Sequence, residues 1–336
     1  MEAAGAPGGE ALKNAMTTIR LLSAVVGLVG FAWGAAWGQA YPSKPVRVVI
    51  VFPPAGATDI VGRIVFQRMS EQLNQQFVID NRAGAGGTIG ASIVAKSPPD
   101  GYTVMVYSAT LVANAHLYKT LPYDALKDFI GLTPVARLVG MLTVHPSMPV
   151  RTTRELIALA KTRPGQIVYG SAGIGAFQHL ATSLLSNMAG VNMVHIPYKG
   201  GGPAAVAEAA GEIQVLLTPI SEVLSHVKSE RVRPIAVSSA ERVTQFPQLP
   251  TIAETVKGYE FISWMGTFVP AGTPKPIVDK LNAELKRAVA DPGVVANLSS
   301  QSLDPMYMTS EEFAKLLKSE YDKYERVVKI SGARID

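Results

Sequence analysis

The sequence contains no cysteine among its 336 residues. This absence excludes disulfides, thiolate metal sites and cysteine nucleophiles together. Charged residues make up only 17% of the chain, and they are scattered without basic runs or interleaved aromatic platforms. Nucleic acid is therefore not an expected partner, although the formal net charge is +5. A modest positive excess of this kind suits the attraction of small anions.

The sequence also lacks the common enzyme motifs. Residues 84–89 end in Ile89 where the dinucleotide fingerprint needs its third glycine. Residues 169–173 begin with Tyr169 where a nucleophile elbow has glycine, and no phosphate-binding P-loop is present. The five histidines show no metal-binding spacing, and no carboxylate pair is placed for acid–base chemistry. These absences predict a binding protein with no metal and no cofactor.

The N-terminus resembles an export signal. An apolar run, Leu21–Trp37, follows Arg20 and leads to small residues ending at Ala40. This pattern predicts a signal peptide over residues 1–40 with cleavage before Tyr41. A membrane anchor is the alternative, but the run is short and contains three glycines, so no stable insertion is expected after cleavage. We hypothesise that Met16 is the true start, because an ordinary signal begins there.

The rest of the chain alternates strand-like and helical segments, which predicts an α/β fold with mostly parallel sheets flanked by helices. The segment 135–146 is long enough to leave one sheet and enter another, so a second unit is expected after it. Strands are predicted at 46–52, 76–81, 100–108, 166–171, 192–198, 213–218 and 232–239, and helices at 60–73, 88–95, 152–163, 178–188, 203–210, 220–228, 277–290 and 310–328.

Four loops of small residues join a strand to a helix. They are residues 52–59, 81–88, 170–175 and 197–203. A helix N-terminus presents unpaired N–H groups and a partial positive charge, and small residues let an anionic ligand reach them. Such turns also use Gly and Ser for geometry and capping alone. Four of them in both halves of the chain favour a ligand cleft.

Single residues in these loops keep two interpretations. Asp59 could meet a ligand's ammonium or hydroxyl group, or it could cap its own helix. Ser171 is expected to be a ligand-binding or capping hydroxyl rather than a nucleophile. Lys199 is either a solvated loop charge or a charge at the rim of a site. His179, in the first turn of an apolar helix, is more typical of a packed histidine than of a ligand contact.

Several segments together carry a family resemblance. They are "YPSKPVRVVIVFPPAGATD", "NRAGAGGTIGASIVAKSPPDGYT", "GSAGIGAFQHLA", "VHIPYKGGGPA", "LPTIAE" and "PAGTP", in this order along the chain. The chain resembles the Bug-type, TctC-like substrate-binding receptors of tripartite tricarboxylate transporters.

The resemblance implies a monomeric periplasmic receptor with a two-domain flytrap architecture and two crossing strands as the hinge. Domain 1 would comprise residues 41–143 plus 265–336, and domain 2 residues 144–264. Such a receptor captures a small carboxylate-bearing molecule and passes it to membrane permease subunits. An exported enzyme acting on carboxylates and a ligand-presenting signalling receptor are the alternatives.

The resemblance also implies which residues face the ligand. The first loop departs from the family's usual Pro-Gly-Gly by having Ala55. The usual aspartate-bearing segment is replaced by residues 218–221, so a di- or aromatic carboxylate without an ammonium group is expected. The expected ligand-binding residues are Phe52, Ala55, Gly56, Ala57, Thr58, Asp59, Ser108, Thr110, Ser171, Gly173, Gly175, His179, Tyr198, Lys199, Gly200 and Thr218.

Overall fold

The computed structural model describes residues 41–335. The expected signal peptide, its cleavage site and the hypothetical start at Met16 concern residues up to 40, outside the described residues. Tyr41–Ser43 are grouped with the preceding residues and contain a cis peptide bond between Tyr41 and Pro42. The compact unit that begins at Lys44 is described below.

The strands of this unit form one curled sheet in the order β2-β1-β3-β9-β4-β7-β5-β6, with β8 and β10 each paired to β4. The pairs β1–β2, β1–β3, β5–β6 and β5–β7 are parallel, and the pairs made by β4 and β9 are antiparallel. The strands are β1 (Val46–Ile50), β2 (Phe77–Asn81), β3 (Thr103–Ser108), β4 (Phe129–Val144), β5 (Val168–Ser171), β6 (Val194–Pro197), β7 (Val215–Pro219), β8 (Arg233–Val237), β9 (Ile262–Pro270) and β10 (Leu303–Pro305).

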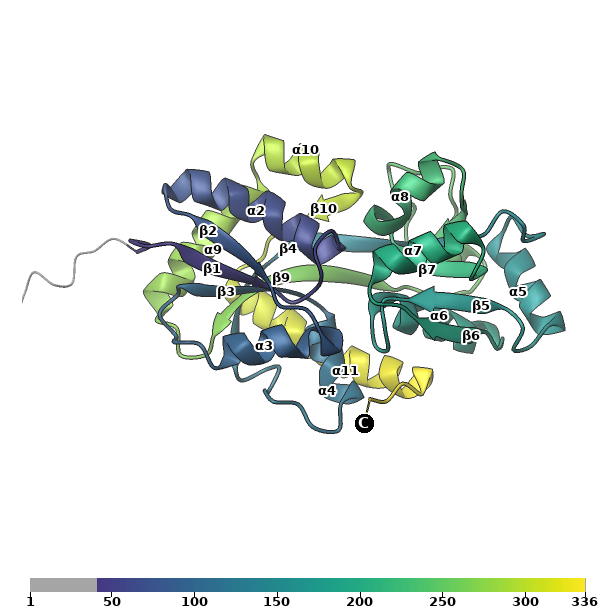
Figure 1. Ribbon diagram of the computed structural model, residues 1–336, viewed down its shortest axis with the longest axis horizontal. Coiled ribbons are helices and arrows are strands. Elements are labelled where there is room, and N and C mark those ends of the chain that lie inside the picture. Colours follow the sequence, from purple (N-terminus) through teal and green to yellow (C-terminus); the bar gives the residue numbers. More distant parts are fainter. Residues whose placement is uncertain (1–40, 336) are drawn as a thin grey trace, which may run out of the picture. The chain divides into compact units, whose positions relative to one another are not determined.

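Strand β4 runs through both halves of the sheet (Figure 1). Its residues Phe129 to Val139 pair with β9, and from Gly140 onward it pairs with β7 and β8. The second crossing lies at the start of β9, where the Phe261 N–H donates to the Ser238 carbonyl just after β8. We call the part around β1–β3 the first half and the part around β5–β7 the second half. The predicted α/β fold with sheet strands flanked by helices is confirmed.

Helices cover both faces of each half (Figure 1). In the first half α2 and α9 pack on one face and α3, α4 and α11 on the other, whereas in the second half α7 and α8 lie opposite α5 and α6. The helices are α2 (Ala57–Leu73), α3 (Thr88–Ala95), α4 (Thr110–Leu117), α5 (Thr153–Thr162), α6 (Phe177–Ala189), α7 (Gly201–Ala210), α8 (Ile220–Lys228), α9 (Lys275–Val289), α10 (Pro292–Ser300) and α11 (Ser310–Ser331), with short 3-10 helices η2 (Ala85–Gly87) and η3 (Ile252–Glu254).

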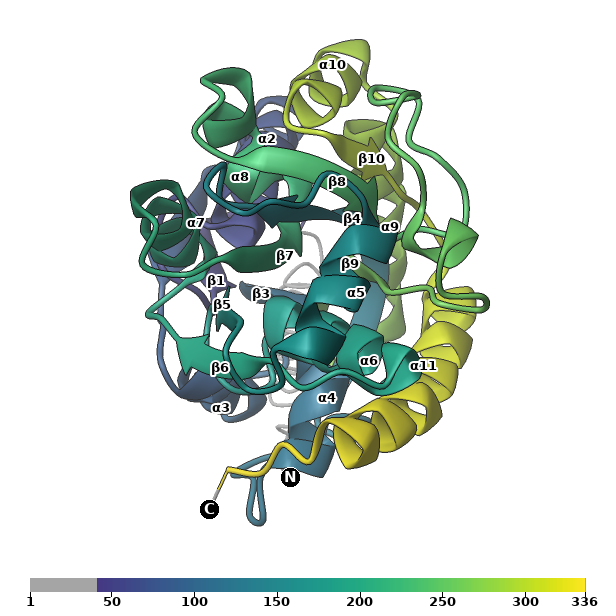
Figure 2. The same cartoon turned by 90° about the vertical axis from the view of Figure 1, so that its right-hand side faces the viewer.

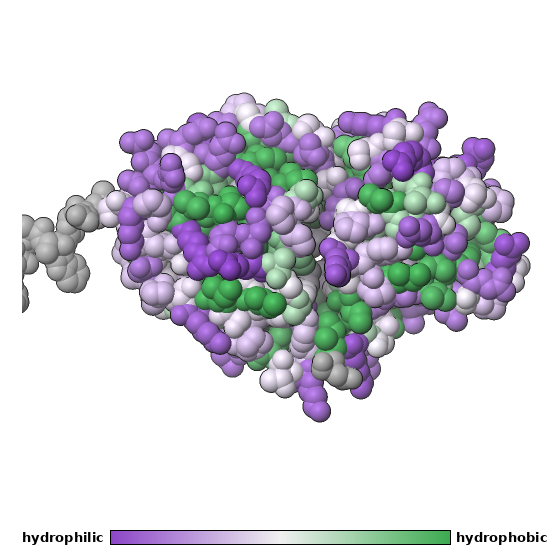
Figure 3. All heavy atoms as spheres, viewed as in Figure 1, coloured by the Kyte–Doolittle hydropathy of each residue, from purple (hydrophilic) through white to green (hydrophobic). Residues whose placement is uncertain are grey.

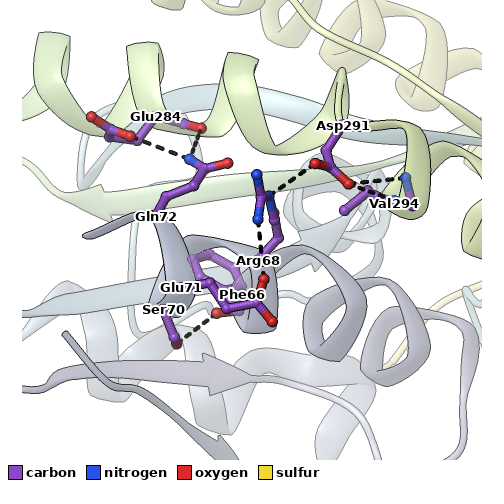
Figure 4. Close-up of polar contacts among 9 residues, drawn as sticks. Phe66, Arg68, Ser70, Glu71, Gln72, Glu284, Asp291 and Val294 are labelled. Atoms are coloured by element: carbon purple, nitrogen blue, oxygen red, sulfur yellow. Dashed lines mark hydrogen bonds and ion pairs between the residues drawn. The ribbon is translucent and has the colours of Figure 1, made fainter. Parts of the chain in front are cut away.

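The C-terminal helices complete the first half. Gln72 near the end of α2 donates its side-chain amide to the Glu284 carbonyl of α9 at 3.1 Å, and Arg68 pairs with Asp291 at 3.1 Å (Figure 4). Asp291 also accepts the Val294 N–H and so caps α10. The Asp291 carboxylate therefore stabilises both the start of α10 and the contact between α2 and the C-terminal helices.

Helix α11 contacts both halves. It begins with a capping box in which Thr309 and Glu312 satisfy each other's backbone N–H groups. It packs against α4 of the first half and α6 of the second half (Figure 2). The buried cluster containing Phe313 and Tyr324 is continuous with core residues of both halves. The last helix is thus part of a shared hydrophobic core.

Several elements differ from the sequence expectations. Helix α2 starts at Ala57, one turn before the predicted start. Strand β4 begins at Phe129 and passes through Pro134 at a register shift, where a proline can be accommodated because the ladder is already interrupted. Helix α4 was not predicted, because its residues are mostly buried and show no amphipathic period. Helix α10 and the short strand β10 were also missed.

Candidate functional site

A cavity of about 250 Å³ lies where loops of the two halves meet. Most of its lining comes from the segments that start five helices: residues 52–58 for α2, 108 and 110 for α4, 176–178 for α6, 199–203 for α7, and 219 and 222 for α8. In the space-filling view a narrow hollow separates the two halves on the visible face (Figure 3). The carboxyl ends of the parallel strands of both halves therefore meet at one cavity, as expected for open α/β sheets.

None of these five helix starts is capped by the side chain of its N-cap residue, although at α4 Ser108 Oγ accepts the Thr110 N–H. The N-cap residues of α2, α6, α7 and α8 are Gly56, Ala176, Gly200 and Pro219, and none of their side chains accepts a first-turn N–H. Among the helices whose starts do not line the cavity, α5, α10 and α11 carry Thr or Asp caps, whereas α3 and α9 have no side-chain cap. Uncapped N–H groups at a shared cavity make a site with positive potential that suits an anion.

Two charged side chains are found among the described residues that line the cavity, Lys199 and Glu222. Glu222 lies in the first turn of α8, and its Oε2 accepts hydrogen bonds from Thr218 Oγ1 at 2.6 Å and Gln178 Nε2 at 2.8 Å. Burial raises the pKa of Glu222, against the effect of these donors and of the Ala57 N–H. Sequence reasoning missed this residue, because an acid in a first helical turn is ordinary.

The presence of Glu222 corrects one premise of the sequence analysis. We inferred from residues 218–221 that the segment after β7 contributes no acid to the site. The structure places a carboxyl group in the cavity at Glu222, the residue that directly follows this segment. The available signal was its position, because Glu222 is in the first turn of the helix that begins at the carboxyl end of β7.

The Asp59 carboxylate is hydrogen-bonded to residues in and around the first loop. It is buried, and its carboxylate accepts hydrogen bonds from the Ala55 N–H at 3.0 Å, Arg63 Nε at 2.8 Å and Asn81 Nδ2 at 2.9 Å. Burial alone would raise the pKa of Asp59, but these donors outweigh it and lower the pKa. Asp59 thereby holds Ala55 in its unusual conformation with φ of 64°. It supports the loop and does not line the cavity.

Three side chains, Ser171, His179 and His195, hold the loop after β5 in a similar way. Ser171 Oγ lies 2.6 Å from His195 Nε2, and the His195 and His179 rings stack with centroids 4.1 Å apart. His179 Nδ1 accepts the Gly175 N–H at 3.1 Å. Burial lowers the pKa of each histidine to about 4, so both imidazoles are neutral at neutral pH. The serine is fully buried and fixes the loop through Gly173, whose N–H it accepts at 3.0 Å.

The structure gathers many of the expected residues at the cavity. A second hollow of about 280 Å³ adjoins it and shares Phe52, Thr110, Ala172 and Ala176 with it. The expected residues that line the first cavity are Phe52, Ala55, Gly56, Ala57, Thr58, Ser108, Thr110, Lys199 and Gly200; Gly173 lines the second hollow, and Asp59, Ser171, Gly175, His179, Tyr198 and Thr218 lie outside both linings. The lining also includes residues that we did not predict: Pro53, Pro54, Leu138, Ala172, Ala176, Phe177, Gln178, Gly201, Gly202, Pro203, Pro219, Glu222, Ser263 and Met265.

Fold and cavity together define a binding protein of the flytrap class. The chain matches the family described as "Tripartite tricarboxylate transporter family receptor" over residues 61–333. It is 33% identical to protein BugT of Bordetella pertussis, over 95% of this chain and 100% of that protein. Two solved structures are also similar. Rpa4515 of R. palustris with adipate has a TM-score of 0.85 and 34% identity, covering 88% of this chain and 100% of that one. MatC from Rhodopseudomonas palustris with bound malate has a TM-score of 0.80 and 28% identity, covering 86% and 99%.

The chain therefore belongs to the tripartite tricarboxylate transporter receptor family. The expected Bug-type resemblance is confirmed, and the protein is a solute-binding receptor rather than an enzyme. No helix among residues 41–335 is both long and apolar enough to cross a membrane.

Proposed function

We propose that this protein is a periplasmic receptor that captures a small carboxylate-bearing ligand in the cavity between its halves and delivers it to the membrane permease of a tripartite transporter. The observation that carries this proposal is the convergence on one cavity of four helix N-termini whose N-cap side chains accept no first-turn N–H. At α2 the Ala57 N–H donates to Glu222, and the other three starts have no such contact among the described side chains. The adipate and malate held by Rpa4515 and MatC support a carboxylate as the ligand class.

The two halves act as domains that close on the ligand. Domain 1 comprises residues 41–143 with 265–336, and domain 2 comprises residues 144–264, so the crossing strands serve as the hinge. A ligand that contacts helix starts from both domains stabilises the closed state, because only that state offers all of its contacts. Residues 1–40 serve as the export signal, and the mature receptor is a monomer.

The test is a thermal-shift screen of the purified protein against mono-, di- and aromatic carboxylates, with uncharged sugars for comparison. At least one carboxylate should raise the melting temperature in a concentration-dependent way. Binding of sugars alone, with no response to any carboxylate, would contradict the proposal.

A variant at the first loop locates the site. Gly56 has φ of −77°, and an added Cβ would make only an ordinary contact with the Pro53 carbonyl. Gly56→Val should therefore keep the fold while its side chain obstructs the start of α2, and ligand binding should be lost. The control is Ala296→Val at an exposed position of α10, which does not line the cavity. Unaltered affinity in Gly56→Val would move the site elsewhere.

A further inference from the structure

The carboxyl group of Glu222 is surrounded by contacts with several elements that line the cavity. It lies against Gly201 at the first position of α7, where an added Cβ would overlap Glu222 Oε2. Thr218 Oγ1 and Gln178 Nε2 both donate to the same oxygen. The Ala57 N–H of the first half also donates to this carboxyl group. Contacts from three helices and one strand end thus hold the group at the wall of the cavity.

The neighbouring amide adds a second acceptor. Gln178 is 2% exposed and lines the cavity, and its Nε2 is occupied by Thr218 and Glu222. Its Oε1 is buried and has no hydrogen-bond partner within the described residues. A buried acceptor without a partner is costly, so a ligand that donates a hydrogen bond here is favoured. Glu222 and Gln178 together form what we call the acceptor pair.

Among the described residues, no Lys or Arg side chain forms an ion pair with the Glu222 carboxyl group of the acceptor pair. Among the described residues, Glu222 forms no ion pair, and neither does Lys199, the other charged residue of the lining. A ligand carboxylate placed beside the acceptor pair would bring no hydrogen-bond donor to the oxygens of Glu222 and Gln178. A cationic nitrogen there would instead form charge-assisted hydrogen bonds.

We propose that the acceptor pair of Glu222 and Gln178 selects ligands that carry a cationic, hydrogen-bond-donating nitrogen in addition to their carboxylate. This inference rests on the proposed function, since the carboxylate binds at the uncapped helix starts. An ammonium group has three donors and no acceptor, which matches a carboxylate and an amide oxygen side by side. The ligand class is thus a small zwitterion such as an amino acid, in place of the ammonium-free carboxylate expected from residues 218–221.

The experiment compares ligands that differ in one group. For straight chains of four to six carbons, calorimetry measures the Kd of the monocarboxylate, its α-amino and ω-amino derivatives, and the dicarboxylate. The wild-type protein should bind an amino derivative at least about tenfold more tightly than both the monocarboxylate and the dicarboxylate of equal length. In Glu222→Gln, which is nearly isosteric, this preference should fall below about threefold.

A matched control uses the same substitution at Glu208, a fully buried glutamate of α7 that does not line the cavity. Glu208→Gln should retain the wild-type preference. If Glu222→Gln fails to fold by circular dichroism, Glu222→Ser takes its place with the same expected loss.

The outcomes separate this inference from the proposed function. If carboxylates bind but the wild type prefers the dicarboxylate, or shows no preference, the acceptor pair does not select a cation. The same holds if the preference survives in the Glu222 variants. If no member of the set binds, and no other carboxylate does, the proposed function fails together with this inference.

Discussion

Glu208 gives a prediction about stability that can be worked out from the structure. Its side chain is 0% exposed beneath β4, where Oε2 accepts from Thr143 Oγ1 at 2.8 Å and Oε1 has no partner within the described residues. Burial raises the pKa of Glu208 from 4.5 to about 8, and the Thr143 hydrogen bond opposes this only in part. The folded protein therefore keeps a proton on Glu208 at neutral pH.

The sign of the effect follows from proton binding. Between pH 4.5 and about 8 the folded state holds the proton on Glu208 and the unfolded state has lost it, so the free energy of unfolding falls as pH rises. Each pH unit in this window contributes roughly 1.4 kcal/mol, which gives about 3 kcal/mol between pH 5 and 7.5. Glu208→Gln cannot ionise and removes this dependence.

Urea unfolding of wild type and Glu208→Gln at several values from pH 5 to 7.5 measures the effect. The stability of the variant relative to wild type should increase by about 3 kcal/mol across this range. Subtraction at each pH removes the contributions of groups common to both proteins. Glu325→Gln, at an exposed position of α11, is the control and should show no such trend. A constant difference between Glu208→Gln and wild type would refute the reasoning.

Two further predictions concern the loop after β5. His179 is buried and His195 is half-buried, and each has a pKa of about 4. The unfolded state therefore binds more protons between pH 6.5 and 4, and stability falls as pH falls through this window. His179→Gln should lessen that loss by up to about 3 kcal/mol in acid unfolding curves compared with wild type. Gly175 has φ of 78°, and an added Cβ would overlap Leu117 of α4, so Gly175→Ala should lower stability by about 1–2 kcal/mol; an unchanged midpoint of urea unfolding would show that the contact between the halves adapts at no cost.

The alternation of strands and helices was predictable because buried parallel strands are continuous apolar runs and the helices beside them have one apolar face. β1 is an example, with every residue but Arg47 buried. The pairing of β3 with β9 could not be predicted, because a local pattern contains no information on which distant strand completes a sheet. Helix α4 was missed for the same local reason, since burial on all sides removes its periodicity.

The cavity was predictable where glycine and alanine expose a helix start, as at residues 55–57 and Gly200. Side chains that act from within a helix gave no such signal. Gln178 and Glu222 have the appearance of ordinary polar residues of α6 and α8, and only the packing of these two helices brings them together. Met265 reaches the lining from β9, which belongs to a distant part of the chain.

The route of the chain through the sheet has a consequence for how the protein is made. The first half begins with β1–β3 but receives β9 and the helices α9–α11 only after the whole second half has been synthesised. Until then β3 has an unpaired edge, and α4 and β4 lack their contacts with α11. A chain interrupted before β9 would expose that edge to other chains, so the N-terminal half is an aggregation hazard until the C-terminal strand and helices are available.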